Sequence, residues 1–542
     1  MRGLKSMRLI AVGAAVALFA TACGGGAGDG DGKAGGELKV HIGEPEHLLP
    51  TNTNETQGGT VLQVLYTSLI DYDKDGKPVN VIADSIDSTD KKLWTIKLKQ
   101  GWKFHNGEAV NADSFINAWN YGAYGPNAQG NSYFFDRIEG YADLQSGEDP
   151  DGDGPKEAPE PKTDKLSGLK KLDDYSFTVS LTEPFSNFAL VLGYTAFNPM
   201  AKACLEDVKS CESSPIGNGP FKMVGKWEHK REIKTVRNDD YKGNKAKLEK
   251  LTFKIFKDDA SAYASLQSGE IDMMGSVPVD KVEEARGTFG DRFIEEPTST
   301  FTYLGLPQYV PELKNKKIRQ ALSLAIDRKE IIKEIFSDRF APAHSVVSPI
   351  VPGSRDDACK YCDPDPDKAK ALLKEAGGWP AGKKLQLWFN AGASHDKWVQ
   401  AVGNQIKDVL GIEYELKGDL EFAEYLEVGD QKKYTGPFRL GWVMDYPSME
   451  NYIKPLYGTQ GSSNSSAYSN AEVDKLVAEG DKAASLEEGI EKYQAAEDII
   501  LEDLPVIPLW FGQSAMAYND NVDNVEYDVI DYNPDYTKIT VT

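Results

Sequence analysis

A single predicted strand and the residues just after it carry the charged side chains best placed to hold a charged ligand. Residues 438–443 are predicted to form this strand, in which alternate side chains share one face. Arg439, Gly441 and Val443 therefore point the same way. Asp445 is expected to continue that direction, where an enclosed carboxylate is the natural partner of an ammonium group such as an α-amino group, whose pKa is about 8. The alternative is that Asp445 only begins a turn.

The same strand carries a cation and a backbone position without a side chain. Arg439 precedes Asp445 by six residues, so the two charges are at most ~20 Å apart at about 3.3 Å per residue. Arg439 could meet a ligand's carboxylate or instead form an ion pair within the protein. Gly441 lets a second backbone approach closely, which suits a ligand that adds itself as an extended strand. Trp442 faces the other way and lines either a side-chain pocket or the core.

Strands and helices alternate along most of the chain, which predicts an α/β fold. Residues 385–389 and 412–416 have strand patterns, and residues 397–410 between them form an amphipathic helix. Such βαβ units have right-handed crossovers and make parallel sheets. Further predicted strands lie at 38–42, 93–98 and 175–181, and Asn111 is predicted to cap a helix that runs to about residue 119.

Size and charge limit the classes of protein that this chain can belong to. The chain has 542 residues, so two or three domains are expected after the leader. The formal net charge of −23 disfavours nucleic acid and anionic lipid headgroups as partners. Beyond residue 22 no apolar stretch is long enough to span a bilayer. Membrane contact is therefore expected only through an anchor.

The first 36 residues predict export and anchoring. Basic residues precede an apolar run at 9–20 that is too short to span a bilayer core of ~30 Å, which is typical of a removable signal peptide. The segment 20–23 resembles a bacterial lipobox, in which Cys23 would be acylated. The glycine-rich residues 24–36 predict a flexible tether. The alternative is ordinary secretion with a spare thiol.

Four further cysteines are expected to be oxidised outside the cell. Pairing Cys204 with Cys211 and Cys359 with Cys362 closes two small loops, and we favour it over the other two connectivities. Cys359 and Cys362 could instead form a redox or zinc half-site, but no second pair with the C-x-x-C spacing exists to complete a zinc site.

Four segments, in order along the chain, resemble signature blocks of one protein family. The similarity is to the large peptide-binding subunits of ABC importers, the oligopeptide and dipeptide class of extracellular solute-binding protein family 5. This resemblance implies a binding protein, and nucleophile or phosphate-loop motifs that would indicate an enzyme do not occur. The four segments are residues 102–113, 266–272, 319–328 and 441–446.

The resemblance implies two α/β lobes that close over the ligand like a clamshell, as in type II periplasmic binding proteins, with an extra domain inserted in the first lobe. The expected division is a signal peptide at 1–22, a tether at 23–36, lobe I at 37–67, 198–300 and 514–542, the inserted domain at 68–197, and lobe II at 301–513.

The resemblance also assigns roles to residues around the predicted strand. Asp445 aligns with the aspartate that holds the ligand's amino terminus, and His395 with a position used at the carboxyl end; the alternative for His395 is a residue that only begins a helix. Val443 stands where some relatives have a cysteine, so a disulfide in the cleft is not expected. Further expected binding residues are Tyr303, Trp442, and Asn54 and Thr56 in the loop after the first strand.

These inferences predict a lipid-anchored monomer on the outer face of the cytoplasmic membrane. It would capture peptides of two to six residues in extended form and deliver them to membrane permease subunits. One alternative is the same fold with another solute, such as a nickel chelate, haem or an oligosaccharide. Another is a calcium-dependent surface adhesion module.

An acidic loop matches the calcium-loop pattern D-x-D-x-D-G-x₅-E. Oxygen atoms at alternate positions of such a loop wrap a hard cation. Prolines within and after the loop leave little room for the usual following helix, so a solvated acidic loop is the alternative. Apart from this structural calcium, no cofactor is expected. The candidate ligands are Asp149, Asp151, Asp153 and Glu160.

Overall fold

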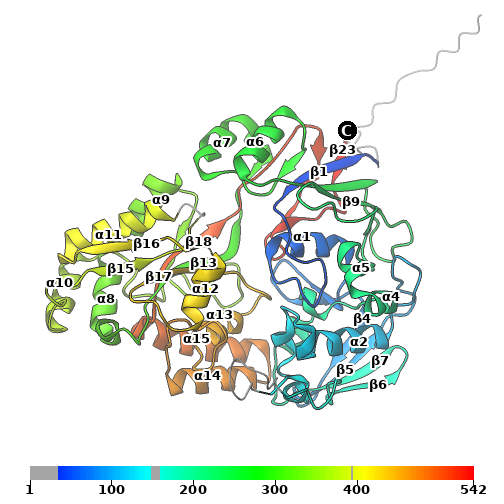
Figure 1. Ribbon diagram of the computed structural model, residues 1–542, viewed down its shortest axis with the longest axis horizontal. Helices are drawn as coiled ribbons and strands as arrows, with labels where there is room; N and C mark the ends of the chain where they lie inside the picture. Colours follow the sequence, from blue (N-terminus) through cyan, green and yellow to red (C-terminus); the bar gives the residue numbers. More distant parts are fainter. Residues whose placement is uncertain (1–34, 148–158, 392–394, 421) are drawn as a thin grey trace, which may run out of the picture.

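The computed structural model describes residues 35–147, 159–391, 395–420 and 422–542. These residues form three main β-sheets with helices packed against them (Figure 1). Each sheet draws its strands from different stretches of the chain. The division into a first lobe, an inserted domain and a second lobe at the residue boundaries given above stays a prediction.

The first sheet has seven strands in the order β12-β19-β11-β1-β10-β9-β8. Its centre is the parallel pair β1 and β10, in which Leu38 lies opposite Leu251 and Val40 opposite Phe253. These apolar side chains are buried beside α1 (Thr56–Leu65). The strands are β1 (Glu37–Ile42), β8 (Phe221–Met223), β9 (Glu232–Arg237), β10 (Lys250–Ile255), β11 (Met273–Met274), β12 (Phe293–Ile294) and β19 (Met516–Tyr518).

The second sheet has four antiparallel strands in the order β4-β5-β7-β6. Helix α2 (Ala112–Ala123) packs on it through Phe115 and Trp119, whose rings lie 6.0 and 5.6 Å from that of Phe177. The predicted cap is confirmed, because the Asn111 side chain accepts from the backbone of Ser114. The strands are β4 (Ala83–Asp87), β5 (Leu93–Leu98), β6 (Leu169–Asp173) and β7 (Ser176–Ser180), next to the hairpin of β2 (Ile70–Tyr72) and β3 (Pro78–Asn80).

The third sheet has six strands in the order β14-β18-β13-β17-β15-β16. The predicted βαβ unit is confirmed, since β15 and β16 are parallel and α11 (Asp396–Leu410) lies between them in the chain. One face packs against α8, α9 and α11, and the other against α12, α13 and α15. The strands are β13 (Pro297–Gly305), β14 (Ala341–Pro342), β15 (Leu385–Trp388), β16 (Tyr414–Lys417), β17 (Phe438–Trp442) and β18 (Val506–Gln513).

The remaining elements connect or cover these sheets. The helices are α3 (Phe188–Val191), α4 (Lys202–Glu206), α5 (Val208–Ser213), α6 (Asp259–Ser268), α7 (Val282–Phe289), α8 (Lys316–Leu324), α9 (Arg328–Phe336), α10 (Pro366–Glu375), α12 (Phe422–Asp430), α13 (Glu450–Tyr457), α14 (Ala471–Asp481) and α15 (Leu486–Asp503). Short strands near the carboxyl end are β20 (Val522–Asp523), β21 (Tyr527–Asp528), β22 (Asn533–Pro534) and β23 (Thr540–Val541). Among the described residues, every helix falls short of the length or the apolar character that a membrane span requires.

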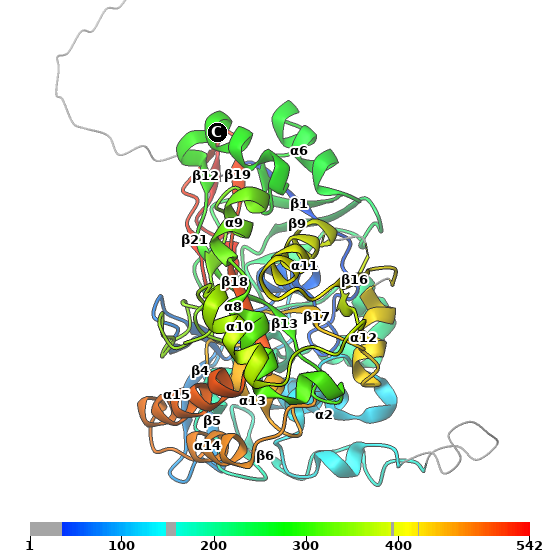
Figure 2. The same ribbon diagram turned by 90° about the vertical axis from the view of Figure 1, so that its left-hand side faces the viewer.

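The chain passes between the first and third sheets at two neighbouring places. Strand β12 leads into β13 after two residues, and β18 leads into β19 after two residues. Because β13 and β18 pair with each other, both connections run side by side (Figure 2). The arrangement suits a hinge, since few backbone torsions separate the two sheets.

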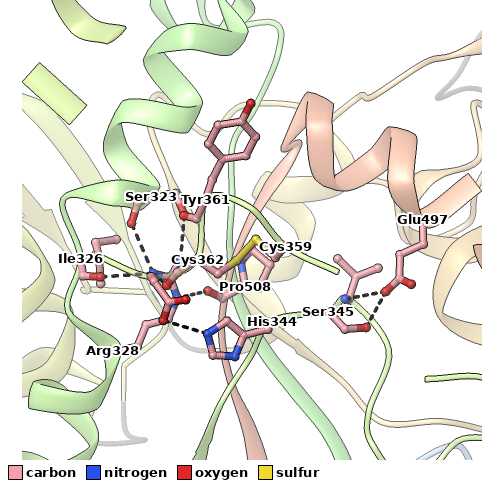
Figure 3. Close-up of a disulfide and its surroundings, with 12 residues drawn as sticks. Ser323, Ile326, Arg328, His344, Ser345, Cys359, Tyr361, Cys362, Glu497 and Pro508 are labelled. Atoms are coloured by element: carbon pink, nitrogen blue, oxygen red, sulfur yellow. Dashed lines mark hydrogen bonds and ion pairs between the residues drawn. A yellow bond between two sulfur atoms is a disulfide. The ribbon is translucent and has the colours of Figure 1, made fainter. Parts of the chain in front are cut away.

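Both local cysteine pairs are disulfides in the structure, as predicted. Cys204 bonds to Cys211 and Cys359 bonds to Cys362, with Cα separations of 5.1 and 5.6 Å. The second disulfide lies beside the fully buried Arg328 (Figure 3). Arg328 donates to the backbone oxygens of Ser323, Ile326, Cys362 and Pro508. This part of the family block at 319–328 therefore has a structural role, because one guanidinium satisfies four carbonyls.

Candidate ligand-binding site

Strand β17 has one edge that the protein pairs only at its start. On one side β17 pairs with β13 along its whole length, from Phe438 to Trp442. On the other side the pairing with β15 among the described residues consists of Trp388 opposite Phe438. Beyond Phe438 the described residues of β17 have no strand partner on this side. The carbonyl of Arg439 accepts from the Tyr425 hydroxyl at 2.7 Å, so Gly441 carries the backbone groups that remain for an extended ligand. The strand ends at Trp442, one residue earlier than the sequence predicted.

Gly441 lies on this partly unpaired stretch. A Cβ at this position would lie 3.4 Å from Phe301 O and 3.7 Å from Arg439 Nη2, both ordinary contacts. Its φ angle is not in the left-handed region. The described contacts of the protein itself therefore do not account for a glycine at this position, and its role in admitting a ligand stays a prediction.

Asp445 is a half-buried carboxylate held by one amide side chain. Asn451 Oδ1 accepts from the backbone N–H of Asp445 at 2.8 Å, and Asn451 Nδ2 donates to Asp445 Oδ2 at 2.9 Å. The pKa of Asp445 is raised to about 6, mainly by burial and also by the neighbouring charge of Glu450, against the lowering by the hydrogen bond from Asn451. Among the described residues no lysine or arginine forms an ion pair with Asp445. The carboxylate is therefore available to a cationic ligand.

Several tyrosine hydroxyls lie near enough to this carboxylate for its charge to act on them. Burial is the main reason that the pKa of each hydroxyl is raised, and the negative charge of Asp445 adds to it. The ring of Tyr133 packs at a tilt against Phe134, which in turn packs at a tilt against Tyr194, with centroids 4.4 Å apart in both cases. The tyrosines are Tyr72, Tyr133 and Tyr194, from the part of the chain around the four-stranded sheet, and Tyr452 and Tyr532.

Sequence reasoning did not find these tyrosines. They lie up to several hundred residues from Asp445 in the chain, and no spacing pattern connects them to it. The only local signal was the aromatic run at 133–135, which alone is equally typical of a core segment.

Arg439 is a half-buried cation without an acidic partner among the described residues. Its Nη1 donates to Asn390 Oδ1 at 3.3 Å, while its Nε is buried without a partner. Burial lowers its pKa, and the hydroxyls of Tyr425 and Tyr303 act in the opposite direction. Tyr303, an expected binding residue on β13, therefore lies near this guanidinium, with its side chain buried.

His395 supplies a second unused donor near Arg439. Its Nδ1 accepts from Trp398 Nε1–H at 3.2 Å, so the neutral ring carries its proton on Nε2. That Nε2 is buried and has no partner among the described residues. Burial and, to a smaller extent, the charge of Arg439 together lower the pKa of His395 to about 3. Two N–H donors without acceptors, one of them cationic, suit an anionic group such as a carboxylate.

The two charged ends of the site have different neighbours. Arg439 lies near Asn390 and His395, at the start of α11, whereas Asp445 lies against Asn451 in α13 and the tyrosines. Because β17 ends before Asp445, strand alternation does not set the direction of that side chain. Asn451 holds the Asp445 side chain in place, and the expectation that Asp445 shares the face of Arg439 stays a prediction.

The other predicted residues have these positions. Trp442 is half-buried against the core, and its indole N–H is buried without a partner among the described residues. Val443 is half-buried just beyond β17. Thr56 is the exposed first residue of α1, and its described contacts are with its own helix. Asn54 is exposed, and its Nδ2 would lie 3.1 Å from a Cβ built at Gly130.

Four predicted features lie wholly or largely outside the described residues. They are the signal peptide at 1–22, the lipidated Cys23, the tether at 23–36 and the calcium loop, of which only Glu160 is described among its ligands, as an exposed residue. Within the described ranges no group of three or more His, Cys, Asp or Glu side chains is arranged to hold a metal ion.

Comparison with known proteins identifies the family. Residues 77–464 match the family model for the middle region of bacterial extracellular solute-binding proteins, family 5. The chain belongs to this family. It is a solute-binding protein of the ABC importer class and not an enzyme, which confirms both predictions.

Relatives match over nearly the whole chain. The oligopeptide-binding protein OppA of Bacillus subtilis is 26% identical over 532 residues, 94% of each chain. The periplasmic oligopeptide-binding protein OppA of Salmonella typhimurium is 26% identical over 545 residues, 95% of each chain. The glutathione-binding protein GsiB of Escherichia coli K12 is 26% identical over 532 residues, 96% of each chain.

Solved structures show the same fold. The ABC transporter substrate-binding protein CtaP of Listeria monocytogenes superposes with a TM-score of 0.79 at 26% identity, covering 94% of this chain and 100% of that one. DppA of Helicobacter pylori, solved in complex with the peptide STSA, gives a TM-score of 0.75 at 21% identity, covering 94% and 98%. The predicted two-lobed α/β fold is confirmed.

Proposed function

We propose that this protein is a lipid-anchored receptor that captures short peptides in extended form and delivers them to the permease of an ABC importer. One observation carries the proposal: Asp445 lacks a cationic partner and Arg439 lacks an anionic partner among the described residues, and they flank the partly unpaired edge of one strand. A free peptide is a zwitterion and supplies both missing charges.

The spacing limits the length of the ligand. Arg439 and Asp445 are six residues apart, which corresponds to at most ~20 Å of extended chain. Two to six peptide residues fit that span, and three or four fit it best. Main-chain hydrogen bonds to the edge of β17 would be independent of the ligand's side chains.

The relatives support this ligand class. The two OppA proteins are named for oligopeptides, GsiB for glutathione, and the H. pylori DppA structure holds a four-residue peptide. Nickel chelates, haem and oligosaccharides lack the free ammonium group that would neutralise Asp445, so the site favours peptides over them.

The proposal is tested by native mass spectrometry of the protein purified from the membrane fraction of its own cells, followed by sequencing of the released ligands. Unmodified peptides of two to six residues are the expected ligands. Titration with a tripeptide, its amino-acetylated form and glutathione then shows whether a free α-amino group is required. Recovery of a sugar or a metal complex, together with no binding of the tripeptide, would contradict the proposal.

A further inference from the structure

The loop that carries Asp445 is held by a buried ion pair from a distant part of the chain. Arg137 lies beside the four-stranded sheet. Its Nη2 donates to Glu450 Oε1 at 2.6 Å and its Nη1 donates to Asp481 Oδ2 at 3.1 Å. Its guanidinium lies 3.7 Å from the ring centroid of Phe185. The two carboxylate side chains are only 2% and 8% exposed. Asp481 also pairs with Lys454 at 3.6 Å, so removing Arg137 leaves the buried charge of Glu450 without an ion pair among the described residues.

A short series of contacts leads from this ion pair to Asp445. Glu450 is the first residue of α13 and accepts from the hydroxyl of Tyr446. Asn451 follows it in the helix and binds both the backbone N–H and the carboxylate of Asp445. Any displacement of Glu450 therefore moves the side chain that orients Asp445.

Residues near the four-stranded sheet contact the loop that carries Asp445 at a second point. Asn187 Nδ2 donates to Ser448 Oγ at 3.2 Å, and Ser448 in turn accepts from the backbone N–H of Glu450. A Cβ built at Gly76, in the β2–β3 hairpin, would lie 3.1 Å from Pro447 Cβ. The hairpin and the Asn187 loop thus pack directly against residues 445–450.

The ion pair of Arg137 with Glu450 also acts on Asp445 through its charges. Glu450 is a buried carboxylate whose charge acts on Asp445, and Arg137 is the main positive charge that lowers the pKa of Glu450 against its burial. The other groups that face this cluster are the five tyrosines described above, Tyr446, Tyr493, Asp136, Lys454 and Asp481. The raised pKa values of the tyrosines keep them neutral between about pH 5 and about pH 8.

We propose that Arg137 is a positioning residue for the ligand's amino group, which acts on Asp445 through Glu450 and Asn451 without touching the ligand. It fixes the start of α13 and neutralises the carboxylate next to Asp445. The region around the four-stranded sheet then contributes to ligand affinity without contacting the ligand. This inference rests on the proposed function, because it needs an ammonium group to bind Asp445.

The test is Arg137→Gln, with Arg355→Gln as the matched control. Arg355 also bonds a buried carboxylate, that of Glu497, at 2.6 Å, and pairs with the exposed carboxylate of Asp498 at 2.8 Å. It is 26% exposed, against 23% for Arg137. None of its described contacts involves residues 445–451. Affinity for a tripeptide with free ends is measured by titration calorimetry from about pH 5 to about pH 8.

Arg137→Gln removes the main positive charge that acts on Glu450, so the pKa of Asp445 rises and the loss of affinity on acidification begins about one pH unit higher than in the wild type. Near pH 6 this corresponds to an affinity about fivefold lower, because the ionised fraction of Asp445 falls from about one half to about one tenth. Adding Glu450→Gln removes the unpaired charge and is expected to return the profile toward that of the wild type. Arg355→Gln is expected to lower thermal stability without shifting the profile.

An unchanged profile in Arg137→Gln, or an equal shift in Arg355→Gln, would overturn this inference alone. Absence of tripeptide binding by the wild-type protein would overturn the proposed function and this inference with it. Should Arg137→Gln not fold, Arg137→Lys keeps the charge but loses the two-armed contact, and a smaller shift in the same direction is expected.

Discussion

Asp445 is unfavourable in the empty protein and favourable in the loaded one. Its raised pKa, about 6, means that the ionised form is costly while no ligand cation is present. We expect Asp445→Asn to raise the unfolding free energy of the ligand-free protein by about 1–2 kcal/mol at neutral pH, after allowance for solvent screening. The same change should weaken peptide binding by about 3 kcal/mol, over a hundredfold. Thermal unfolding measures the change in stability and titration calorimetry the change in affinity. Unchanged affinity would show that Asp445 does not bind the peptide.

Arg439 is expected to bind the carboxylate end of the ligand. The wild-type protein is expected to bind a tripeptide about tenfold more tightly than the same tripeptide with a carboxyl-terminal amide, since a charge-assisted hydrogen bond contributes about 1.5 kcal/mol or more. Arg439→Met removes the cation and should make the two affinities equal. Lys433→Met, an exposed change in the same segment, is the control. Discrimination that survives in Arg439→Met would assign the carboxylate to another group, with His395 the next candidate.

At the scale of the element, the site depends on a strand whose edge is left partly unpaired. Gly441→Val adds a β-branched side chain that suits a strand and meets only ordinary contacts at its Cβ. The added methyl groups would project over the face where Arg439 lies. We expect thermal stability to change little and peptide affinity to fall at least about tenfold, or 1.4 kcal/mol. Thermal unfolding shows whether the variant is folded, and titration calorimetry measures its affinity for the peptide. Retained affinity would show that the ligand does not approach β17 at Gly441.

At the scale of the whole molecule, ligand binding should couple to pH. An ammonium ligand needs ionised Asp445, so the rise in melting temperature caused by saturating peptide should be largest above about pH 7. It should decline as the pH falls through about 6, the pKa of the empty site. Binding near pH 6 should also release protons, which calorimetry in buffers of different ionisation enthalpy detects. An amino-acetylated peptide lacks the ammonium group and serves as the control.

Local features of the fold followed from the sequence alone. The Asn111 cap, the βαβ unit around α11 and the disulfide of Cys359 with Cys362 each depend on residues that lie close together in the chain. Their determinants are capping geometry, hydrophobic periodicity and short loop closure, all of which act locally. The blocks of family resemblance and the charged residues of β17 were also visible without coordinates.

The surroundings of those charges were decided only by the tertiary structure. Arg137 and Glu450 are 313 residues apart in the chain. The charge of Asp445 acts on tyrosines as far away in the chain as Tyr72. Asn451, just inside α13, rather than strand alternation, orients Asp445. No local pattern encodes such contacts, because they form only when separately folded sheets and their loops pack against one another. The sequence therefore determined which side chains carry charge, and the packing of the sheets determined which of them lack a partner and can receive a ligand.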